Sequence, residues 1–464
     1  MVAPRNRPEP VIGIVHFGPG AFHRAHQADY IDRLLDLDPR WGIAAVSMRS
    51  RGTVDALAAQ DGLYTLAIRD AAPAMRVIGA HRRFLGPEDA RETLGLLTRA
   101  EVRLVTTTVT EKGYCLAPDG TLDLAHPDIV GDLARPAVPQ SVIGWIVAGL
   151  KARREAGVAP FVPMPCDNLA NNGSKLHAAL VAFAQASDDP VLADWIAGEV
   201  RVPSTMVDSI TPASDDALYT NVAATLGVED RAAVQRETFT QWVIEDIGDL
   251  GPDLSSVGAT LTGDVSGYER AKLRILNGAH STLAYAGLLR GHTSVAAAMR
   301  DPVLAAFIDA MIRRDIMPML SPVPGLDLDA YRAAVLKRFA NPAIVHRLDQ
   351  IAQDGSQKLP YRLGDTLIAN RGAGRMPYHV VAALGCWVAF LMHRGRDGVA
   401  IVDPAGDRLM EAARRESPAG VIDALAGQGL GIPSEVAGDS SLIAALKSAT
   451  EAVFSGCISP FQPG

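Results

Sequence analysis

The chain has 464 residues, of which 48% are apolar and 21% charged, and its formal net charge is −8. This length exceeds what one hydrophobic core usually serves, so two globular domains are expected. The negative charge and the lack of a long basic run argue against a nucleic-acid partner, because phosphate binding needs clustered Lys and Arg.

The four cysteines, Cys115, Cys166, Cys386 and Cys457, are widely spaced and form no CxxC pair. They indicate neither a disulfide framework nor a structural zinc site, and they fit a reducing cytoplasm. The N-terminus runs into a strand-like segment, so we expect no signal peptide. Residues 380–392 are the most apolar segment, but they are shorter than the roughly 20 residues that cross a bilayer. We therefore expect a cytoplasmic protein with a small-molecule partner and no membrane or nucleic-acid contact.

The first part of the chain alternates strand and helix patterns. Residues 11–18, VIGIVHFG, are β-branched and end in glycine, as a buried parallel strand does. Apolar residues at helical spacing then predict a helix over residues 21–37, which Asp38-Pro39 ends. A second strand over residues 41–48 completes a strand-helix-strand unit, which is how a dinucleotide-binding sheet begins. Further strand candidates are residues 102–110 and 161–164.

After Tyr268 the pattern changes to Ala-rich and Leu-rich helical stretches. The predicted helices cover residues 268–289, 295–316, 327–339, 380–392 and 442–454. The C-terminal part is therefore predicted to be mostly α-helical.

The first strand is followed by Gly18-Pro19-Gly20-Ala21-Phe22-His23, which matches the first two glycines of the dinucleotide fingerprint. Gly18 permits a tight turn, and Gly20 lets the backbone approach a pyrophosphate at the start of a helix. The third glycine serves helix-strand packing, so His23 in its place implies a wider approach. Two glycines alone also fit a plain strand-to-helix turn. The cofactor-binding candidates here are Phe17, Gly18, Gly20, Ala21, Phe22 and His23.

The end of the second strand carries Ser47-Met48-Arg49-Ser50-Arg51, where NAD-binding proteins usually have an acidic residue for the ribose. Arg49 or Arg51 could hold the 2′-phosphate of NADP, could stack on adenine with NAD bound, or could belong to a solvated loop. We take Arg49 as a cofactor-binding candidate, with NAD preferred and NADP not excluded.

Residues 18–35, GPGAFHRAHQADYIDRLL, closely resemble the opening of the polyol-specific long-chain dehydrogenases, the family of mannitol 2-dehydrogenase, arabinitol dehydrogenase and fructuronate reductase. Further segments agree in family order: TVTEKGY (108–114), PCDNLANNG (165–173), STMVDSITP (204–212), QWVIED (241–246), KLRILNGAHSTLAYAG (272–287) and DGSQKLPYR (354–362). The resemblance runs from residue 11 to about residue 392. Ser209 departs from the pattern, since many members have Arg there.

The resemblance implies an α/β protein in two domains. Residues 1–265 would form a Rossmann-type parallel-sheet domain with extra segments, and residues 266–464 a mostly α-helical domain, with substrate in the cleft between them. It also implies chemistry without zinc. His16, His23 and His26 cluster in the sequence, but no cysteine or carboxylate completes a ligand set, so we expect no metal site.

Oxidation of a secondary alcohol needs a base for the hydroxyl proton, donors for the developing alkoxide and a nicotinamide that accepts hydride. On a regular helix, Glu269, Asn277 and His280 would lie within about 140° of Lys272, so all four could face one cleft. Gly278 indicates a close approach by substrate or backbone, or a local break.

The resemblance assigns these residues their roles. Lys272 would be the general acid/base, because desolvation lowers the pKa of a lysine toward neutrality. Asn277 and Asn168 would stabilise the oxyanion, His280 would orient the substrate and Glu269 would pass protons to solvent. Without the resemblance, Glu269 and Lys272 would read as a solvated helical pair.

Lys358, Arg347 and Glu111 are further substrate-binding candidates, and Lys358 could equally be a surface lysine. The leading hypothesis is an NAD-dependent polyol 2-dehydrogenase that converts D-mannitol or D-arabinitol into fructose or xylulose. An alternative is a hexuronate (fructuronate or tagaturonate) reductase, whose substrate carboxylate would pair with a cation such as Arg347, Lys358, Arg371 or Arg375. A non-catalytic dinucleotide-binding regulator is a third reading, but it would have no need of the group at Lys272. The sequence leaves the oligomeric state unknown.

Overall fold

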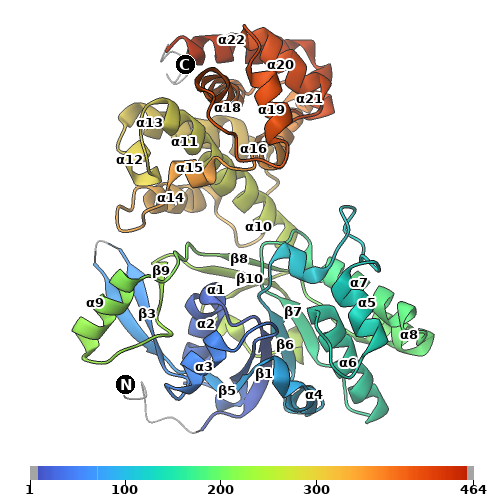
Figure 1. Cartoon of the computed structure of the whole chain (residues 1–464). Helices are drawn as coiled ribbons and strands as arrows, with labels where there is room; N and C mark the ends of the chain where they lie inside the picture. Colours follow the sequence, from blue (N-terminus) through green and yellow to red (C-terminus); the bar gives the residue numbers. More distant parts are fainter. Residues whose placement is uncertain (1–8, 71, 457–464) are drawn as a thin grey trace. The chain divides into compact units, whose positions relative to one another are not determined.

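The computed structural model describes residues 9–70 and 72–456, and the chain divides into two compact units (Figure 1). Unit 1 is Met1–Ser266 and unit 2 is Gly267–Gly464. Unit 1 contains the strands and unit 2 is built of helices. The predicted fold class, an α/β Rossmann-type domain with a mostly helical C-terminal domain, is confirmed.

The central sheet of unit 1 has five parallel strands in the order β5-β2-β1-β6-β7. The strands are β1 (Ile12–Phe17), β2 (Gly42–Val46), β5 (His81–Leu85), β6 (Leu104–Thr107) and β7 (Val162–Pro165). Phe17 pairs with Val46 and with Thr107, and Thr107 pairs with Pro165, so four strands end at the same edge. The chain order reverses at β1, and such a switch point is where open α/β sheets bind ligands.

Side chains of the central sheet are buried on both faces, which explains the continuous apolar runs in its strands. Val15 and Val105 pack with one set of helices, and Ile14 and Leu104 pack with α2 on the other face. The helices on the first face are α4 (Ala90–Leu97), α6 (Val142–Glu155) and α7 (Asn172–Ala186), and α2 is Gln27–Leu34 (Figure 1).

Six short strands form the extra segments of unit 1. β3 (Tyr64–Arg69), β4 (Ala74–Ile78) and β9 (Val234–Glu237) make one sheet, and β8 (Thr205–Asp208), β10 (Gln241–Glu245) and β11 (Thr260–Thr262) make another. The remaining α-helices of unit 1 are α3 (Gly52–Ala58), α5 (Pro127–Ala134), α8 (Pro190–Glu199) and α9 (Asp216–Leu226).

The helix predicted over residues 21–37 is not continuous. It is split into α1 (Ala21–Ala25) and α2, because His26 between them has φ −121° and ψ −88°. His26 Nε2 lies 2.9 Å from the carbonyl oxygen of Gln241 in β10, and its ring stacks on Phe22 at 5.1 Å. These tertiary contacts hold the break, which local helical spacing could not indicate.

Unit 2 is organised around α18 (Tyr378–Asp397), in which residues 380–392 are all buried. It packs against α11 (Gly278–Leu289), α19 (Gly406–Ala413), α20 (Pro418–Gly427) and α22 (Ser440–Phe454) (Figure 1). The helices predicted over residues 327–339, 380–392 and 442–454 are confirmed, the first of them as α14 (Leu328–Phe339) with Asp327 as its cap.

The predicted helix over residues 295–316 is interrupted. It consists of α12 (Val295–Met299), α13 (Pro302–Met311) and a π-helical segment, η7 (Ile312–Ile316). Pro302 cannot continue a helix from the residues before it but suits a first helical position, and Asp301 caps α13 by accepting from the Val303 amide at 3.0 Å. The other helices of unit 2 are α10 (Val265–Ala271, which begins in unit 1), α15 (Leu348–Ile351), α16 (Gly355–Leu359), α17 (Asp365–Gly372) and α21 (Ser434–Gly438).

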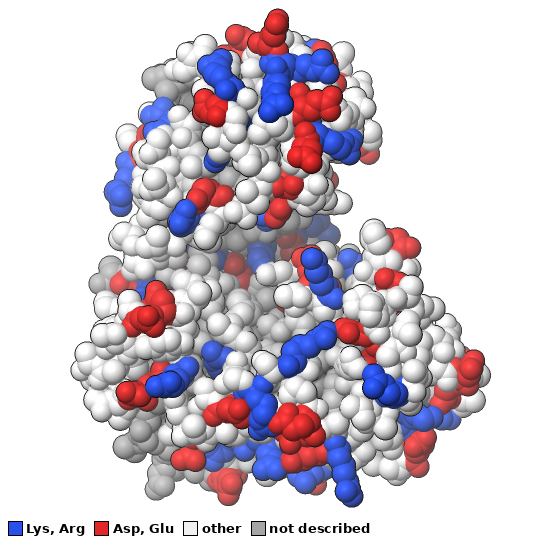
Figure 2. Space-filling view, in the orientation of Figure 1, with Lys and Arg blue, Asp and Glu red and all other residues white. Residues whose placement is uncertain are grey.

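Among the described residues, no helix combines the length and apolarity that crossing a membrane requires. On the face drawn in Figure 2, basic and acidic side chains are interspersed and neither sign forms a continuous patch.

Candidate active site

The carboxyl edge of the central sheet gathers the candidate residues of unit 1. Gly18 follows β1, Arg49 follows β2, Glu111 follows β6 and Asn168 follows β7. Because these strands are parallel and end in register, their following loops meet at one edge. Sequence reasoning identified these four positions without knowing the strand order.

The two glycines of the turn differ in what requires them. Gly18 has φ +88°, and a Cβ on it would lie 2.3 Å from the carbonyl oxygen of Thr108, so no larger residue fits. Gly20 is exposed, and a Cβ there would meet only the Gly18 carbonyl at 3.9 Å. The protein itself leaves open space at Gly20. This space fits the close approach of a cofactor pyrophosphate to the backbone.

His23, at the third fingerprint position, is buried between two other histidines. Its ring stacks on that of His16 at 3.4 Å, and its Nε2 lies 3.0 Å from Nε2 of His81. His16 Nε2 lies 3.1 Å from the Gly18 carbonyl oxygen, and since a carbonyl only accepts, this nitrogen carries the proton. The His23 side chain thus fills the space between helix and strand, and its contact with the cofactor stays a prediction.

Burial keeps these three imidazoles neutral. It lowers the pKa of His16 and of His81 to about 3 and that of His23 well below its usual value, with the neighbouring imidazoles and Arg24 as further causes for His23. The cluster therefore holds the turn by packing and neutral hydrogen bonds.

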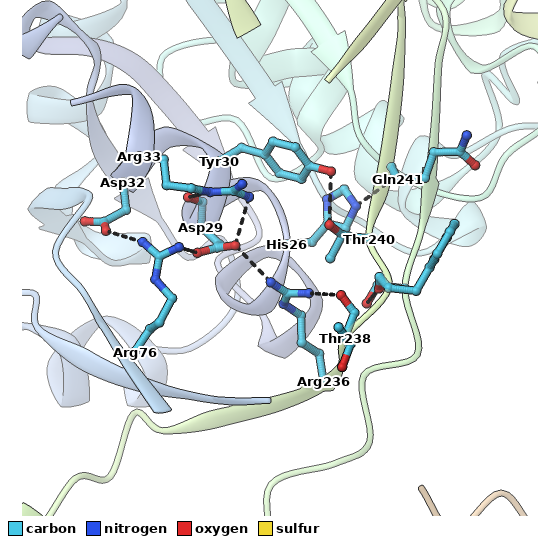
Figure 3. A network of polar contacts seen from close by, with 12 residues as sticks. His26, Asp29, Tyr30, Asp32, Arg33, Arg76, Arg236, Thr238, Thr240 and Gln241 are labelled. Atoms are coloured by element: carbon cyan, nitrogen blue, oxygen red, sulfur yellow. Dashed lines mark hydrogen bonds and ion pairs between the residues drawn. The ribbon is translucent and has the colours of Figure 1, made fainter. Parts of the chain in front are cut away.

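The second helix after the turn, α2, is fixed by the ion network of Figure 3. Asp29 of α2 is buried and pairs with Arg33 at 3.0 Å, Arg76 of β4 at 2.9 Å and Arg236 of β9 at 2.9 Å. Arg236 also donates to the Thr238 carbonyl at 3.2 Å. The network ties α2 to the sheet β4-β3-β9, so the extra segments support the second of the two helices that follow the glycine turn.

The two arginines after β2 already have acidic partners. Arg49 Nη2 lies 2.5 Å from Asp128 Oδ2, and Arg51 pairs with Asp55, Glu88 and Asp89. A 2′-phosphate would have to compete with these carboxylates, which favours a cofactor without one. The role of Arg49 in cofactor binding stays a prediction.

The other cofactor candidates lie around the turn. Phe17 is fully buried with its ring 5.8 Å from that of Trp145, whereas Ala21 and Phe22 are half-buried at the start of α1. The Phe17 side chain therefore belongs to the core.

One group of potential metal ligands occurs among the described residues: Cys115, His126 and Asp128, whose ligand atoms lie within 4.8 Å of one another. Asp128 is paired with Arg49, and His126 Nδ1 accepts from the Asp128 amide at 3.2 Å. Burial raises the pKa of the Cys115 thiol to about 11, so the thiol is protonated near neutrality. We assign no metal site to this group.

Asn168 is exposed, and the residue before it, Asp167, is held by hydrogen bonds. Tyr114 donates a short hydrogen bond to the buried carboxylate of Asp167, whose other oxygen accepts from the Leu169 amide at 3.1 Å. Burial raises the pKa of Asp167 to about 6.

In unit 2, Lys272 and Asn277 are the first and last residues of a π-helical segment, η6 (Lys272–Asn277), between α10 and α11. The Gly278 amide donates to the Leu273 carbonyl, five residues back. The regular helix assumed for the angles about Lys272 is therefore wrong here, since the wider turn shifts Asn277 and His280 around the axis. Such π turns within helices occur frequently at functional sites.

Gly278 marks a close approach between two segments of unit 2. A Cβ on it would lie 2.9 Å from the carbonyl oxygen of Arg362, which belongs to a third π-helical segment, η9 (Pro360–Gly364). The sequence left open whether Gly278 served a close approach or a break. Both occur, because the π segment ends just before it.

His280 lies two residues into α11 in a group of cationic side chains. Its Nε2 is buried and has no hydrogen-bond partner among the described residues. The ring stacks on Phe339 at 5.4 Å and lies 4.6 Å from the ring of His346. Burial lowers the pKa of His280 well below its usual value, and His346, Arg362, Arg338 and Lys358 add to this effect. The neutral imidazole thus presents an unsatisfied polar atom.

The remaining candidates of unit 2 differ in their surroundings. Lys358 Nζ donates to the Gln353 carbonyl at 2.9 Å and lies 3.5 Å from Asp354. Arg347 is exposed and paired with Asp349, and Glu269 is half-buried in α10. Of the cations suggested for a substrate carboxylate, Arg371 bonds Asp439 and Arg375 bonds the Arg314 carbonyl. Of the four cations suggested for a substrate carboxylate, Lys358 is the one whose charge lowers the pKa of His280.

Sequence reasoning missed five residues: Arg338, His346 and Arg362 around His280, and Tyr114 and Asp167 behind Asn168. Arg362, Tyr114 and Asp167 stand inside segments that carried the family resemblance, so those segments contained the signal. Arg338 and His346 precede the DGSQKLPYR segment and had no local signal.

Two family models match the chain. The mannitol dehydrogenase Rossmann domain covers residues 12–255, and the mannitol dehydrogenase C-terminal domain covers residues 264–454.

Similar proteins extend over most of the chain. D-mannonate oxidoreductase of Escherichia coli (strain K12) is 42% identical over 84% of this chain and 82% of its own length. Mannitol 2-dehydrogenase of Cereibacter sphaeroides is 40% identical over 88% of this chain and 87% of its own length.

Among solved structures, the ternary complex of Pseudomonas fluorescens mannitol 2-dehydrogenase with NAD and D-mannitol has a TM-score of 0.80 at 35% identity. It covers 98% of this chain and 94% of its own. A substrate-free D-sorbitol dehydrogenase has a TM-score of 0.91 at 29% identity, over 98% and 96% of the two chains. Because both family models match in order and together span nearly all described residues, the chain belongs to the mannitol dehydrogenase family.

Proposed function

We propose that the chain is an NAD-dependent polyol 2-dehydrogenase, which oxidises the C2 hydroxyl of a mannitol-type or arabinitol-type sugar alcohol to a ketose. Family membership and the similarity to two mannitol 2-dehydrogenases support this activity. The observation that carries it is the buried, unsatisfied Nε2 of His280, on the same helical run as Lys272 and Asn277. Such an atom needs a polar partner, and a substrate hydroxyl supplies one.

Each residue has a defined task in this reaction. Lys272 removes the hydroxyl proton as general base, and Glu269, one turn earlier, relays that proton to solvent. The amides of Asn277 and Asn168 donate to the developing alkoxide and do not themselves titrate. His280, which is neutral, bonds a substrate hydroxyl through Nε2. When bound, NAD supplies the acceptor for the hydride from C2.

The proposed substrate contacts beyond the reacting carbon are Lys358, Arg347 and Glu111. Gly18 and Gly20 would hold the cofactor pyrophosphate, with Phe17, Ala21, Phe22, His23 and Arg49 around them. NAD rather than NADP is favoured because Arg49 and Arg51 are already paired with carboxylates. We also propose a cytoplasmic location, since Cys115, Cys166 and Cys386 are free buried thiols.

An assay of NAD reduction with D-mannitol and D-arabinitol, and of NADH oxidation with fructose and xylulose, tests the proposal. We expect turnover of at least one pair and a lower kcat/KM with NADP than with NAD. A protein that binds NADH but turns over no polyol or ketose would refute it.

A second candidate function is reduction of a hexuronate to an aldonate. The specific observation is the positive charge around His280, because Arg338, Arg362 and Lys358 each lower the pKa of its imidazole. A neutral polyol offers these cations no countercharge, whereas a substrate carboxylate would. The similarity to D-mannonate oxidoreductase points in the same direction.

The effect of an Arg362 substitution on kcat/KM distinguishes the two candidate functions. If the substrate carries a carboxylate, kcat/KM for fructuronate exceeds that for fructose, and Arg362→Gln lowers the fructuronate value about 100-fold or more, as expected for loss of a charge-assisted hydrogen bond. Arg290→Gln is the matched control, because Arg290 pairs with Asp301 at 2.7 Å outside the site. Equal losses with fructose and fructuronate would exclude a carboxylate contact at Arg362.

A further inference from the structure

A chain of three hydrogen-bonding groups lies behind Asn168. Thr107 ends β6, Tyr114 ends the short helical turn η3 (Glu111–Tyr114), and Asp167 follows β7. Thr107 Oγ1 lies 2.7 Å from the Tyr114 hydroxyl, which donates a short hydrogen bond to Oδ2 of Asp167. Since an ionised carboxylate only accepts, the proton of Tyr114 points at Asp167 and Thr107 donates to Tyr114.

The other contacts of Asp167 fix residues that follow Asn168 in the chain. Oδ1 of Asp167 accepts from the Leu169 amide at 3.1 Å, so the carboxylate spans the residue between them. The side chain of Asn172, which is buried and bonded to Thr205, also donates to Asp167. Every partner of the carboxylate is a donor, and together they fix the loop that carries Asn168.

We propose that Asp167, held by Tyr114, is the positioning residue of Asn168 in the dehydrogenase reaction. The inference rests on the proposed function, since it needs Asn168 to act on the substrate oxygen. Asp167 would not touch substrate. Its ionised carboxylate holds the loop in the conformation that presents the Asn168 amide.

The charge state of Asp167 makes this role dependent on pH. The pKa of Asp167 is raised to about 6, with burial as the largest cause; the hydrogen bonds from Tyr114, Leu169 and Asn172 oppose the rise, and the like charge of Glu111 adds to it. The other titratable neighbours, Tyr114 and Cys166, stay neutral because burial raises the pKa of each. Below about pH 6 Asp167 would be protonated. One of its oxygens would then carry a hydrogen that faces a donor, so that hydrogen bond would be lost and the loop would be released.

Tyr114→Phe tests the inference, because it removes the donor and leaves Asp167 and Asn168 in place. Loss of a hydrogen bond to a charged group raises the pKa of Asp167 by about one to two pH units. In ketose reduction Lys272 acts as the acid and is active when protonated, so its own titration does not limit the rate at low pH. The acid limb of kcat for ketose reduction should therefore move upward by that amount, while kcat at pH 9 stays within a few-fold of wild type. NADH affinity should not change. Asp167→Asn should lower kcat at every pH.

Tyr64→Phe is the matched control, since Tyr64 is equally buried in unit 1 and donates to the Arg24 carbonyl at 2.7 Å. Its acid limb should coincide with that of the wild type. If Tyr114→Phe and Tyr64→Phe give the same pH profile, Asp167 does not position Asn168 and the inference is wrong. A wild-type protein with no polyol turnover at any pH would instead refute the proposed function.

The melting temperature gives a readout that does not depend on activity. The loss in Tm caused by Tyr114→Phe should widen as the pH rises through about 6, because the lost hydrogen bond is stronger to the ionised carboxylate. The loss caused by Tyr64→Phe should not vary in this way. A constant loss for Tyr114→Phe would overturn the charge state assigned to Asp167.

Discussion

Acidification should destabilise unit 1 through the histidine cluster His16, His23 and His81. These imidazoles are buried and neutral in the folded protein, and the pKa of His16 and of His81 is lowered to about 3. In the unfolded chain their pKa returns to about 6.5, so unfolding takes up protons below that pH. Stability is therefore fully present above about pH 7 and is lost as the pH falls through 6.5.

The size of the effect follows from the same values. Between pH 8 and pH 5, each histidine with a folded pKa near 3 removes about 2 kcal/mol from the free energy of unfolding. His16 and His81 together remove about 4 kcal/mol, and His23 acts in the same direction. This is a large part of the roughly 5–15 kcal/mol that stabilises a typical domain.

Urea titrations at pH 8, 7, 6 and 5, followed by tryptophan fluorescence, measure this loss. Four of the five tryptophans, Trp41, Trp145, Trp195 and Trp242, lie in unit 1, so the signal reports mainly on that unit. His81→Phe should reduce the slope between pH 6 and pH 5 by about 1 kcal/mol per pH unit. The control His177→Gln, on α7 outside the cluster, should keep the wild-type slope. Stability that stays constant between pH 8 and pH 5 would refute the reasoning.

Three further predictions concern other parts of the molecule. Asp29→Ala leaves Arg236 buried without its countercharge and should cost about 3–5 kcal/mol of unfolding free energy, measured by the same urea titration; a loss below 1 kcal/mol would contradict the network of Figure 3. Gly20→Val should leave Tm unchanged but weaken NADH binding, because the new side chain would enter space that the protein leaves open. Gly18→Val should lower Tm, because Gly18 has a positive φ and a side chain there would clash with the Thr108 carbonyl. Equal effects of the two variants would contradict this distinction. Turnover should survive dialysis against EDTA, because the proposed acid/base is a lysine, and activity restored only by added metal would show otherwise.

The parallel strands and the glycine turn were predictable from the sequence because their signals are local. Residues 11–18 and 102–110 are continuous apolar or β-branched runs, which the burial of both sheet faces requires. By contrast, β5 reads HRRFL and β9 reads VQRE. Such short polar strands form because distant segments pair with them, and no local pattern indicates that pairing.

Among the helices, too, those with a local signal were predictable and those shaped by distant contacts were not. Residues 380–392 were predictable because a buried helix is apolar throughout, but the break at His26 depends on a contact with Gln241, 215 positions away. The π turn at Lys272 was also invisible, since a single inserted residue leaves the apolar spacing nearly unchanged.

The site was predictable in part. The segments that resemble the family contain Lys272, Asn277, His280 and Asn168, but they do not show what surrounds these residues. The charges at His280 come from Arg338, Lys358 and Arg362 on separate elements, and the support of Asn168 comes from Tyr114, more than 50 positions earlier. These are tertiary arrangements, so only the fold displays them.

The central claim is that Lys272 is the general acid/base of a polyol dehydrogenase, and Lys272→Met tests it most directly. Pre-steady-state measurement of hydride transfer from D-mannitol to NAD, together with NADH binding by fluorescence, separates chemistry from cofactor binding. The account predicts a fall in the rate of hydride transfer of about 100-fold or more with NADH affinity unchanged. Hydride transfer within a few-fold of the wild type would contradict it.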